Sequence, residues 1–413
     1  MKRRVVITGL GAVTPVGLNV ASLWENLLAG KSGISLIEKF DTTDFTSKIA
    51  GEIKNFNPEE YFEKKEIKKL DLYTQFALVA AREAMKDANL TPGSFDPNRA
   101  GCIMGAGIGG IWTFQEETEK FFNKGAKRVG PFFIPKMISN IAAGHIAIEN
   151  NLKAINFNVV SACASANHAI GTSFRSIQYG DADIIISGGA EGAVNPMAMA
   201  GFCAMKALST RNEEPTRASR PFDQERDGFV MSEGAGMLVL EELEHALARG
   251  ANIYGELVGY GASCDAFHVT APAEGGEGSA RAIDFAIKDG GLTPQDIDYI
   301  NAHGTSTPLN DKNETSAIKT VFGAHTSNLA INSTKSMVGH MLGAAAGIEA
   351  IVCCLSIRDS KVHQTLNYEN PDPDCDLNYT PKNTIDKEVR AAVSNSLGFG
   401  GHNSAIVIKK FVK

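Results

Sequence analysis

Cys163 lies in a segment whose residue types suit a cysteine nucleophile. Residues 155–160 alternate apolar and polar side chains, which predicts a strand, and the small residues from 161 to about 180 predict a helix. Cys163 is therefore expected on a sharp turn just before a helix N-terminus. Unpaired N–H groups and the helix dipole stabilise an anion there, which predicts a lowered thiol pKa. The alternative is a small buried cysteine, the usual environment of a free thiol.

Two of the nine histidines stand where an α/β protein binds its ligands. His303 follows a predicted strand in the run Asn-Ala-His-Gly-Thr-Ser-Thr, and His340 lies at the start of a predicted helix rich in small residues. A lone histidine is more often a core residue bonded to backbone groups, but a pair opposite a cysteine turn favours catalysis. Lys335, near the same buried region, needs a counter-ion, for which Glu314 is the candidate.

Four lysines form a second notable group. Lys64, Lys65, Lys68 and Lys69 are spaced so that a helix would present them on one side. A solvated face, neutralised by the neighbouring glutamates, is one interpretation. Because the chain carries a net charge of −7, a local basic patch is also suited to an acidic partner.

Composition excludes several classes of protein. The chain has 413 residues, is 43% hydrophobic and carries a net negative charge, so bulk attraction to nucleic acid is not expected. No apolar run is long enough to span a bilayer, and the first residues do not resemble a signal peptide. Seven cysteines without a C-x-x-C pair disfavour both a disulfide framework and a zinc site. We expect a cytoplasmic protein that binds no membrane.

The two halves of the chain repeat one pattern. Each begins with a strand and a glycine turn, and each has a later strand that leads into a helix rich in Ala and Gly, at residues 161–171 and 333–347. This predicts a duplicated α/β fold with halves at 1–250 and 251–413. The two small-residue helices are expected to pack near a pseudo-twofold axis, so that reactive groups at their starts face one pocket.

The remaining elements are predicted from hydrophobic periodicity and from the residues that begin and end helices. Helices are predicted at residues 21–28, 71–87, 138–149, 279–289, 311–322 and 339–357. The segment 131–135, with prolines around aromatic residues, predicts an irregular apolar wall. The segment 197–226 is also predicted to be irregular.

Four motifs in order resemble the β-ketoacyl-[acyl-carrier-protein] synthases of the thiolase superfamily. They are Ser-Ala-Cys-Ala-Ser at 161–165, Asn-Ala-His-Gly-Thr-Ser-Thr at 301–307, Lys335 with Gly-His at 339–340, and Gly-Phe-Gly-Gly at 398–401. The resemblance extends over residues 4–409 and is most similar to the elongating condensing enzymes of bacterial type II fatty acid synthesis. It implies a layered αβαβα fold with two mixed sheets around buried helices.

The resemblance implies an acyltransferase that condenses malonyl-carrier protein, after loss of CO2, with an acyl chain held on Cys163. His303 and His340 would promote decarboxylation, and the backbone N–H groups of Cys163 and Phe399 would form the oxyanion hole. Phe399 would gate the chain, and Lys335, held by Glu314, would order the site. The substrate-binding and supporting residues implied are Thr305 and Thr307 for the pantetheine arm, Ile108 and Phe202 for the acyl channel, and Thr270, Gly400 and Asp311.

The same resemblance implies partners. Acyl carrier protein, loaded with acyl or malonyl groups, supplies the phosphopantetheine, so no cofactor of the enzyme's own is required. The implied carrier-docking patch comprises Lys64, Lys65, Lys68, Lys69, Lys127, Arg128 and Lys206. A structural monovalent cation is implied at Asn301, Glu349, Ser394 and Asn395. A homodimer is expected, with the strand at 155–160 as a sheet edge paired across the interface.

Three residues near the motifs depart from the family pattern: Leu397 for an aromatic residue, His402 for Thr, and Val338 for Thr. They leave the acyl-length preference open. Alternatives are a polyketide-type ketosynthase, a thiolase acting on coenzyme A, a non-catalytic chain-length-factor subunit and a cysteine hydrolase. A thiolase would bring a second catalytic cysteine in the closing motif, and a chain-length factor would lack Cys163. A hydrolase would need an orienting Asn or Asp beside its histidine.

Overall fold

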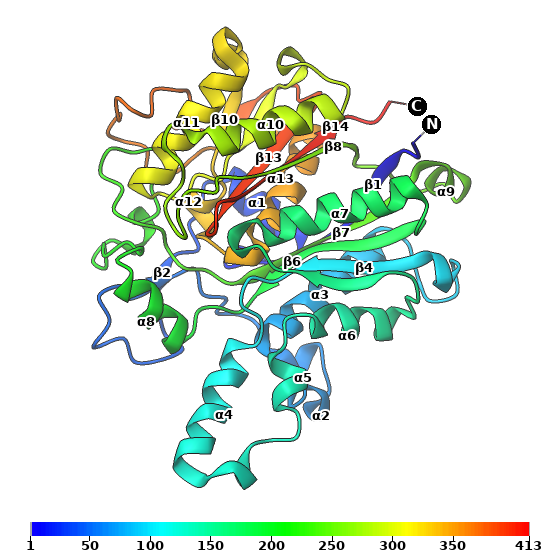
Figure 1. The fold of residues 1–413 in the computed structure, drawn as a ribbon, viewed down its shortest axis with the longest axis vertical. Helices are drawn as coiled ribbons and strands as arrows, with labels where there is room; N and C mark the ends of the chain where they lie inside the picture. The colour runs from blue at the N-terminus through cyan, green and yellow to red at the C-terminus, as the bar shows by residue number, and fades with distance from the viewer. Residues whose placement is uncertain (1, 413) are drawn as a thin grey trace.

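The computed structural model describes residues 2–412. They form a mixed sheet with helices on its outer faces and between its two halves (Figure 1). Ten strands build the main sheet: β1 (Val5–Val13), β4 (Ala100–Gly105), β5 (Asn156–Val159), β6 (Ile184–Glu191), β7 (Gly234–Glu242), β8 (Gly255–Cys264), β9 (Tyr299–Asn301), β10 (Ala330–Asn332), β13 (Ala391–Gly398) and β14 (His402–Lys409). Short strands β2 (Ser35–Leu36), β3 (Ile49–Ala50), β11 (Lys361–Val362) and β12 (Ile385–Asp386) form two small ribbons.

The strand order repeats between the two halves of the chain. The sheet runs β10-β9-β13-β14-β8-β1-β7-β6-β4-β5. Each half contributes five strands, which can be numbered in chain order within that half. Read from β1 or β8 at the centre to the edge of the sheet, both halves have the order first, fifth, fourth, second and third strand. This is the arrangement expected of a duplication. The α/β class and the duplicated fold are confirmed. The two mixed sheets are continuous, since β1 and β8 pair antiparallel between Val5 and Leu257, Val6 and Glu256, and Ile7 and Gly255. The domain boundary at residue 250 stays a prediction.

Helices lie on both outer faces and between the halves of the sheet (Figure 1). The helices are α1 (Val20–Leu28), α2 (Lys64–Ile67), α3 (Leu72–Asp87), α4 (Ile111–Lys124), α5 (Phe133–Met137), α6 (Ile141–Asn150), α7 (Ser165–Tyr179), α8 (Pro196–Ala204), α9 (Leu243–Ala248), α10 (Glu277–Asp289), α11 (Pro308–Phe322), α12 (Lys335–Val338) and α13 (Ala345–Asp359). The first half packs α3 and α6 outside and α7 inside, and the second packs α10 and α11 outside and α13 inside.

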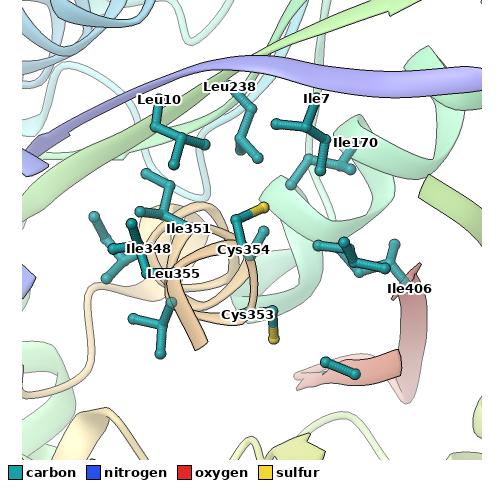
Figure 2. Close-up of a cluster of buried hydrophobic side chains, with 14 of the residues drawn as sticks. Ile7, Leu10, Ile170, Leu238, Ile348, Ile351, Cys353, Cys354, Leu355 and Ile406 are labelled. Carbon is teal, nitrogen blue, oxygen red and sulfur yellow. The ribbon is translucent and has the colours of Figure 1, made fainter. Parts of the chain in front are cut away.

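The two inner helices form the centre of the molecule. Helices α7 and α13 contact each other, as the small-residue pattern predicted. Helix α13 is buried from Ala345 to Ile357, with Ile348, Ile351, Cys354 and Leu355 in the same apolar cluster as residues of β1, β7, α7 and β14 (Figure 2). Apart from Glu349 and Ser356 the buried residues of α13 are apolar or glycine, and a helix with apolar residues on every side is stable only when protein surrounds it.

Glycines explain how closely these helices lie on the strands. A Cβ built on Gly347 would meet the carbonyl oxygen of Gly236 at 2.4 Å, and one on Gly105 would meet the backbone of Ser165 at 2.4 Å. Any side chain at these positions would push an inner helix away from the sheet. The start of α7 therefore lies directly against the end of β4, and the start of α13 lies directly against the beginning of β7.

Several predicted elements differ from the structure. Residues 196–204 form α8, whose N-cap Asn195 accepts from the backbone N–H groups of Met197 and Ala198, so the segment expected to be irregular begins as a helix. Helix α5 starts within the predicted apolar wall. The long helix predicted from residue 339 starts only at Ala345, because residues 339 and 342 have positive φ angles of 73° and 46°.

No helix within residues 2–412 is long and apolar enough to cross a membrane. The predicted cytoplasmic location stays a prediction.

Candidate active site

Cys163 lies on a one-turn 3-10 helix, Ala162–Ala164, that joins β5 to α7. Ala162 has a φ of 50°, a left-handed conformation that a non-glycine residue adopts only when its surroundings enforce it. The hydroxyl of Ser165 accepts the N–H of Ser161 at 2.9 Å and donates to the carbonyl of Ala162 at 2.7 Å. The turn that presents the thiol is thus fixed by its own flanking serines.

The thiol pKa differs from the prediction. Burial raises the pKa of Cys163 to about 12, although the Lys335 ammonium and the backbone N–H groups of Cys163 and Phe399 act to lower it. The expected lowering at a helix N-terminus was therefore wrong for the free protein, because removal from water outweighs the nearby positive groups. The resting group is a neutral thiol at neutral pH.

The loop after β13 packs directly against this turn. A Cβ on Gly398 would lie 2.7 Å from the carbonyl oxygen of Ser161 and 3.3 Å from the nitrogen of Cys163. Only glycine lets the two segments approach so closely. The next residue, Phe399, places its N–H beside the sulfur and its ring 6.5 Å from that of Phe202. Two N–H groups thus converge near the sulfur, as an oxyanion hole requires.

His303 and His340 meet in the same pocket. Their rings are 5.4 Å apart between centroids and nearly perpendicular, at 87°. His303 follows β9 and His340 follows α12, and both side chains are buried. Burial holds the pKa of each histidine well below its usual range, with the charge of Lys335 adding to the effect. Both imidazoles are therefore neutral at neutral pH.

Lys335 pairs with Glu349, not with Glu314 as predicted. The ammonium contacts Oε1 of Glu349 and lies 3.3 Å from Nδ1 of His303, and both charged side chains are buried. Glu349 projects from α13, which packs on the inner face of the sheet where Lys335 lies, whereas Glu314 comes from the outer helix α11. An ammonium must donate, so Nδ1 of His303 accepts and its proton resides on Nε2.

Glu314 instead supports the backbone of the histidine loop. Its carboxylate accepts the N–H of His303 at 2.6 Å and of Gly304 at 2.8 Å, and the side-chain amide of Asn395 at 2.7 Å. Asp311, one turn earlier on α11, accepts the N–H of Phe222 at 2.8 Å. Burial raises the pKa of Glu314 to about 7. Glu314 and Asp311 thus support the site by accepting hydrogen bonds from backbone N–H groups.

A cavity of 480 Å³ connects these groups with the surface. It contains both histidines and Cys163 and is lined mainly by apolar side chains. Of the residues predicted to bind substrate, the cavity wall includes Ile108, Phe202, Thr270, Thr305 and Thr307. Gly400 is not part of the wall. Its N–H instead donates to the carbonyl of Val269 at 2.6 Å, which joins the Phe399 loop to the loop that carries Thr270.

The predicted docking residues are exposed but lie on several elements. Lys64 and Lys65 belong to the single turn α2, which projects from the body together with α4 and α5 (Figure 1). Lys68 and Lys69 follow its end, so one helix does not carry all four lysines. Lys69 lies 5.5 Å from the ring centre of Phe132, beside α5. Lys127 and Arg128 form a turn after α4, and Lys206 lies at the cavity mouth.

The residues predicted to hold a monovalent cation fit that role in part. Asn301 and Ser394 are paired neighbours on β9 and β13, and each has a buried oxygen without a hydrogen-bond partner. Glu349, whose second carboxylate oxygen is also unpartnered, comes from α13 on the same side. Asn395 also has a buried oxygen without a hydrogen-bond partner, but its side chain points to the opposite face, where its amide donates to Glu314. Asn301, Ser394 and Glu349 are the side chains that would hold the ion, which would supply positive charge beside Glu349 and no reacting group.

Two further buried residues were not identified from the sequence. Glu191, at the end of β6, accepts four backbone N–H groups beside the cavity. Arg226 donates to the carbonyls of Thr307 at 3.2 Å and Pro308 at 3.1 Å. A charged residue that ends an apolar strand was the available signal for Glu191, but its partners come from two segments distant from it in the chain.

Comparison with known proteins agrees with this geometry. The β-ketoacyl synthase N-terminal domain matches residues 2–246, and the β-ketoacyl synthase C-terminal domain matches residues 254–369. The chain belongs to the β-ketoacyl synthase family. Among curated members, the 3-oxoacyl-[acyl-carrier-protein] synthase 2 of Staphylococcus aureus strain COL is 51% identical over 409 residues, 99% of each chain. That of Synechocystis is 48% identical over 410 residues, again 99% of each chain.

Solved structures of the family share the fold. A β-ketoacyl synthase from Burkholderia phymatum matches with a TM-score of 0.93 at 33% identity. A type II polyketide ketosynthase, solved with its acyl carrier protein and a hexaketide, matches with a TM-score of 0.91 at 39% identity. Both comparisons cover 100% of both chains. This β-ketoacyl synthase is thus an acyltransferase with the thiolase-like fold of its family.

Proposed function

We propose that this β-ketoacyl synthase elongates a carrier-bound acyl chain by two carbons, as a 3-oxoacyl-[acyl-carrier-protein] synthase II. The observation that carries the proposal is one apolar cavity that holds a cysteine with two converging N–H groups and two neutral histidines. The identity of about half of all residues with the synthase 2 enzymes supports the same substrates.

The first half-reaction loads the enzyme. The sulfur of Cys163 attacks the carbonyl of an acyl thioester, and the N–H groups of Cys163 and Phe399 stabilise the oxyanion that forms. The carrier's pantetheine thiol leaves with the proton that Cys163 gives up. Because the resting thiol is neutral, a base must accept this proton during the attack. His340 is the neutral histidine with a ring nitrogen free to accept it, because Nδ1 of His303 already accepts from Lys335 and its Nε2 carries a proton.

The second half-reaction makes the carbon–carbon bond. Malonyl-carrier protein loses CO2, and the electron pair of the broken bond passes into an enolate. Nε2–H of His303, whose tautomer Lys335 fixes, and an N–H of His340 donate to the enolate oxygen. The enolate carbon attacks the acyl-Cys163 thioester, the 3-oxoacyl-carrier protein departs, and the released thiolate takes up a proton.

Carrier docking and homodimerisation form part of the proposal. The exposed basic residues on α2 and after α4, with Lys206 at the mouth of the cavity, suit an acidic carrier protein. The solved polyketide ketosynthase in complex with its carrier protein supports such a partner. Strand β5 lies at the edge of the sheet with Phe157 exposed, which suits pairing with β5 of a second copy.

A polyketide-type ketosynthase remains the alternative, because such enzymes share both the fold and the chemistry. The higher identity with the 3-oxoacyl-[acyl-carrier-protein] synthase 2 enzymes favours the elongation reaction over polyketide synthesis. The chain-length-factor alternative does not explain the presence of Cys163 and both histidines in one cavity.

Intact-protein mass spectrometry tests the function. Mixing the enzyme with a long-chain acyl-carrier protein should add one acyl group, and Cys163→Ala should add none. Malonyl-carrier protein should then discharge the adduct as a 3-oxoacyl product. Absence of an adduct in the unmodified enzyme would refute the assigned nucleophile or donor, and an adduct formed only from acyl-coenzyme A would favour a thiolase-like or initiating enzyme.

A further inference from the structure

A buried carboxylate lies behind the cavity and has no part in the steps above. Glu191 ends β6 and is fully buried. None of the ion pairs among residues 2–412 includes it, so no cation neutralises it. A carboxylate in such a place is stable only if hydrogen bonds replace its water. Burial raises the pKa of Glu191 to about 7, and the backbone N–H groups around it lower the pKa in turn.

The donors to Glu191 come from two separate segments. The N–H of Gly107 donates to Oε2 at 2.7 Å, and those of Ile108 and Gly109 donate to Oε1 at 3.1 Å and 3.2 Å. The N–H of Gly343, on the turn after His340, donates to Oε2 at 3.1 Å. One side chain thus joins a loop of the first half to a turn of the second.

These two segments form one wall of the cavity. Ile108 and Leu342 both line it, next to Cys163. The segments also touch each other, since a Cβ on Gly343 would lie 2.2 Å from the nitrogen of Gly107 and 2.8 Å from Oε2 of Glu191. The carboxylate therefore sets the positions of Ile108 and Leu342 relative to one another and to the sulfur.

We propose that Glu191 is a positioning residue for the acyl chain: its carboxylate holds the Ile108 loop and the Leu342–Gly343 turn together as the surface on which the chain lies during transfer to Cys163. The inference rests on the proposed function. The rate of transfer to Cys163 depends on Glu191 for an acyl chain long enough to extend along this surface, and does not depend on it for a chain of two to four carbons.

The test measures the rate of acyl-Cys163 formation with the shortest and the longest saturated acyl-carrier proteins that the unmodified enzyme accepts. In Glu191→Gln, the amide has one acceptor oxygen and turns an N–H₂ donor toward N–H donors, so the two segments should separate. The long chain should transfer about tenfold more slowly or worse, and the short chain within about threefold of the unmodified rate. Glu191→Asp keeps the charge but is too short to reach both segments, so it should show the same selectivity.

Glu241→Gln is the matched control. Glu241 is a buried carboxylate on β7 bonded to Thr8, His245 and Arg249, away from the cavity. It should lower the melting temperature without changing the ratio of long-chain to short-chain rates. Equal losses for both chains in the Glu191 variants, or no loss, would overturn the positioning role. Failure of the unmodified enzyme to form any adduct would instead refute the proposed function.

Discussion

The ammonium group of Lys335 lies 3.3 Å from Nδ1 of His303 and contacts Glu349 at the same time. This arrangement does two things at once. It fixes the histidine tautomer that donates into the cavity, and its positive charge adds to burial, the larger cause, in lowering the pKa of both histidines. Glu349 makes the buried ammonium tolerable, since an unpaired charge there would be costly.

Lys335→Met should therefore destabilise the fold as well as the site. Removal of one partner from a buried ion pair typically costs about 3–5 kcal/mol, because the other charge stays buried and unpaired. Urea unfolding should show this loss, and Lys335→Met with Glu349→Gln should recover most of it. Equal stability of Lys335→Met and the unmodified protein would contradict the pairing.

Substitution of either histidine should separate the two half-reactions. His303→Ala and His340→Ala each remove an N–H donor to the enolate oxygen, so release of CO2 from malonyl-carrier protein should fall by about 10²-fold to 10⁴-fold. Loading of Cys163 should persist in at least one of the two variants, because the oxyanion hole is built from backbone. A radiometric CO2 assay and intact mass measure the two steps. Undiminished decarboxylation in both variants would contradict the assigned roles.

The reactivity of Cys163 should depend steeply on pH. Burial raises its thiol pKa to about 12, and iodoacetamide reacts with the thiolate. The alkylation rate should therefore rise about tenfold per pH unit between pH 6 and pH 9, without a plateau. A Cys264→Ser background removes the exposed thiol, and Cys163→Ala identifies the labelled site. A plateau below pH 8 would show that the helix N-terminus lowers the pKa after all.

Charge reversal on the projecting patch should weaken carrier binding. Replacement of Lys64, Lys65, Lys68 and Lys69 by Glu should raise the KM for acyl-carrier protein by about tenfold or more at low salt, with little change in kcat. The difference should shrink as salt screens the charges. Lys288→Glu, which reverses an exposed lysine on α10, is the control. An unchanged KM would place the carrier elsewhere on the surface.

A monovalent cation should stabilise the protein through Asn301, Ser394 and Glu349. The melting temperature in potassium or sodium chloride should exceed that in tetramethylammonium chloride of equal ionic strength by about 1 °C or more. Ser394→Ala removes one of the unpartnered oxygens and should reduce the difference. Identical melting temperatures in all three salts would exclude the ion.

Short stretches of sequence were sufficient to predict the groups that gather in the cavity. Cys163, His303 and His340 follow strands or precede helices in runs of small residues, and local spacing carries that signal. The order of strands and small-residue helices occurs once in each half of the chain. That repetition predicted the duplication, because each half contains the complete pattern. The strand order and the contact between α7 and α13 confirm that prediction.

Only the tertiary structure decided what surrounds those groups. Glu314 and Glu349 are both acids on helices near Lys335 in the chain, and the choice between them depends on which face of the sheet each helix covers. The pKa of Cys163 is a sum over burial and charges from several distant segments, so local reasoning from the helix N-terminus gave the wrong direction. Glu191 accepts hydrogen bonds from backbone N–H groups near residues 107 and 343. A local sequence pattern does not predict hydrogen bonds between a side chain and backbone groups so far away in the chain. Local spacing therefore determined which residues are reactive, whereas packing between distant segments determined their protonation and their support.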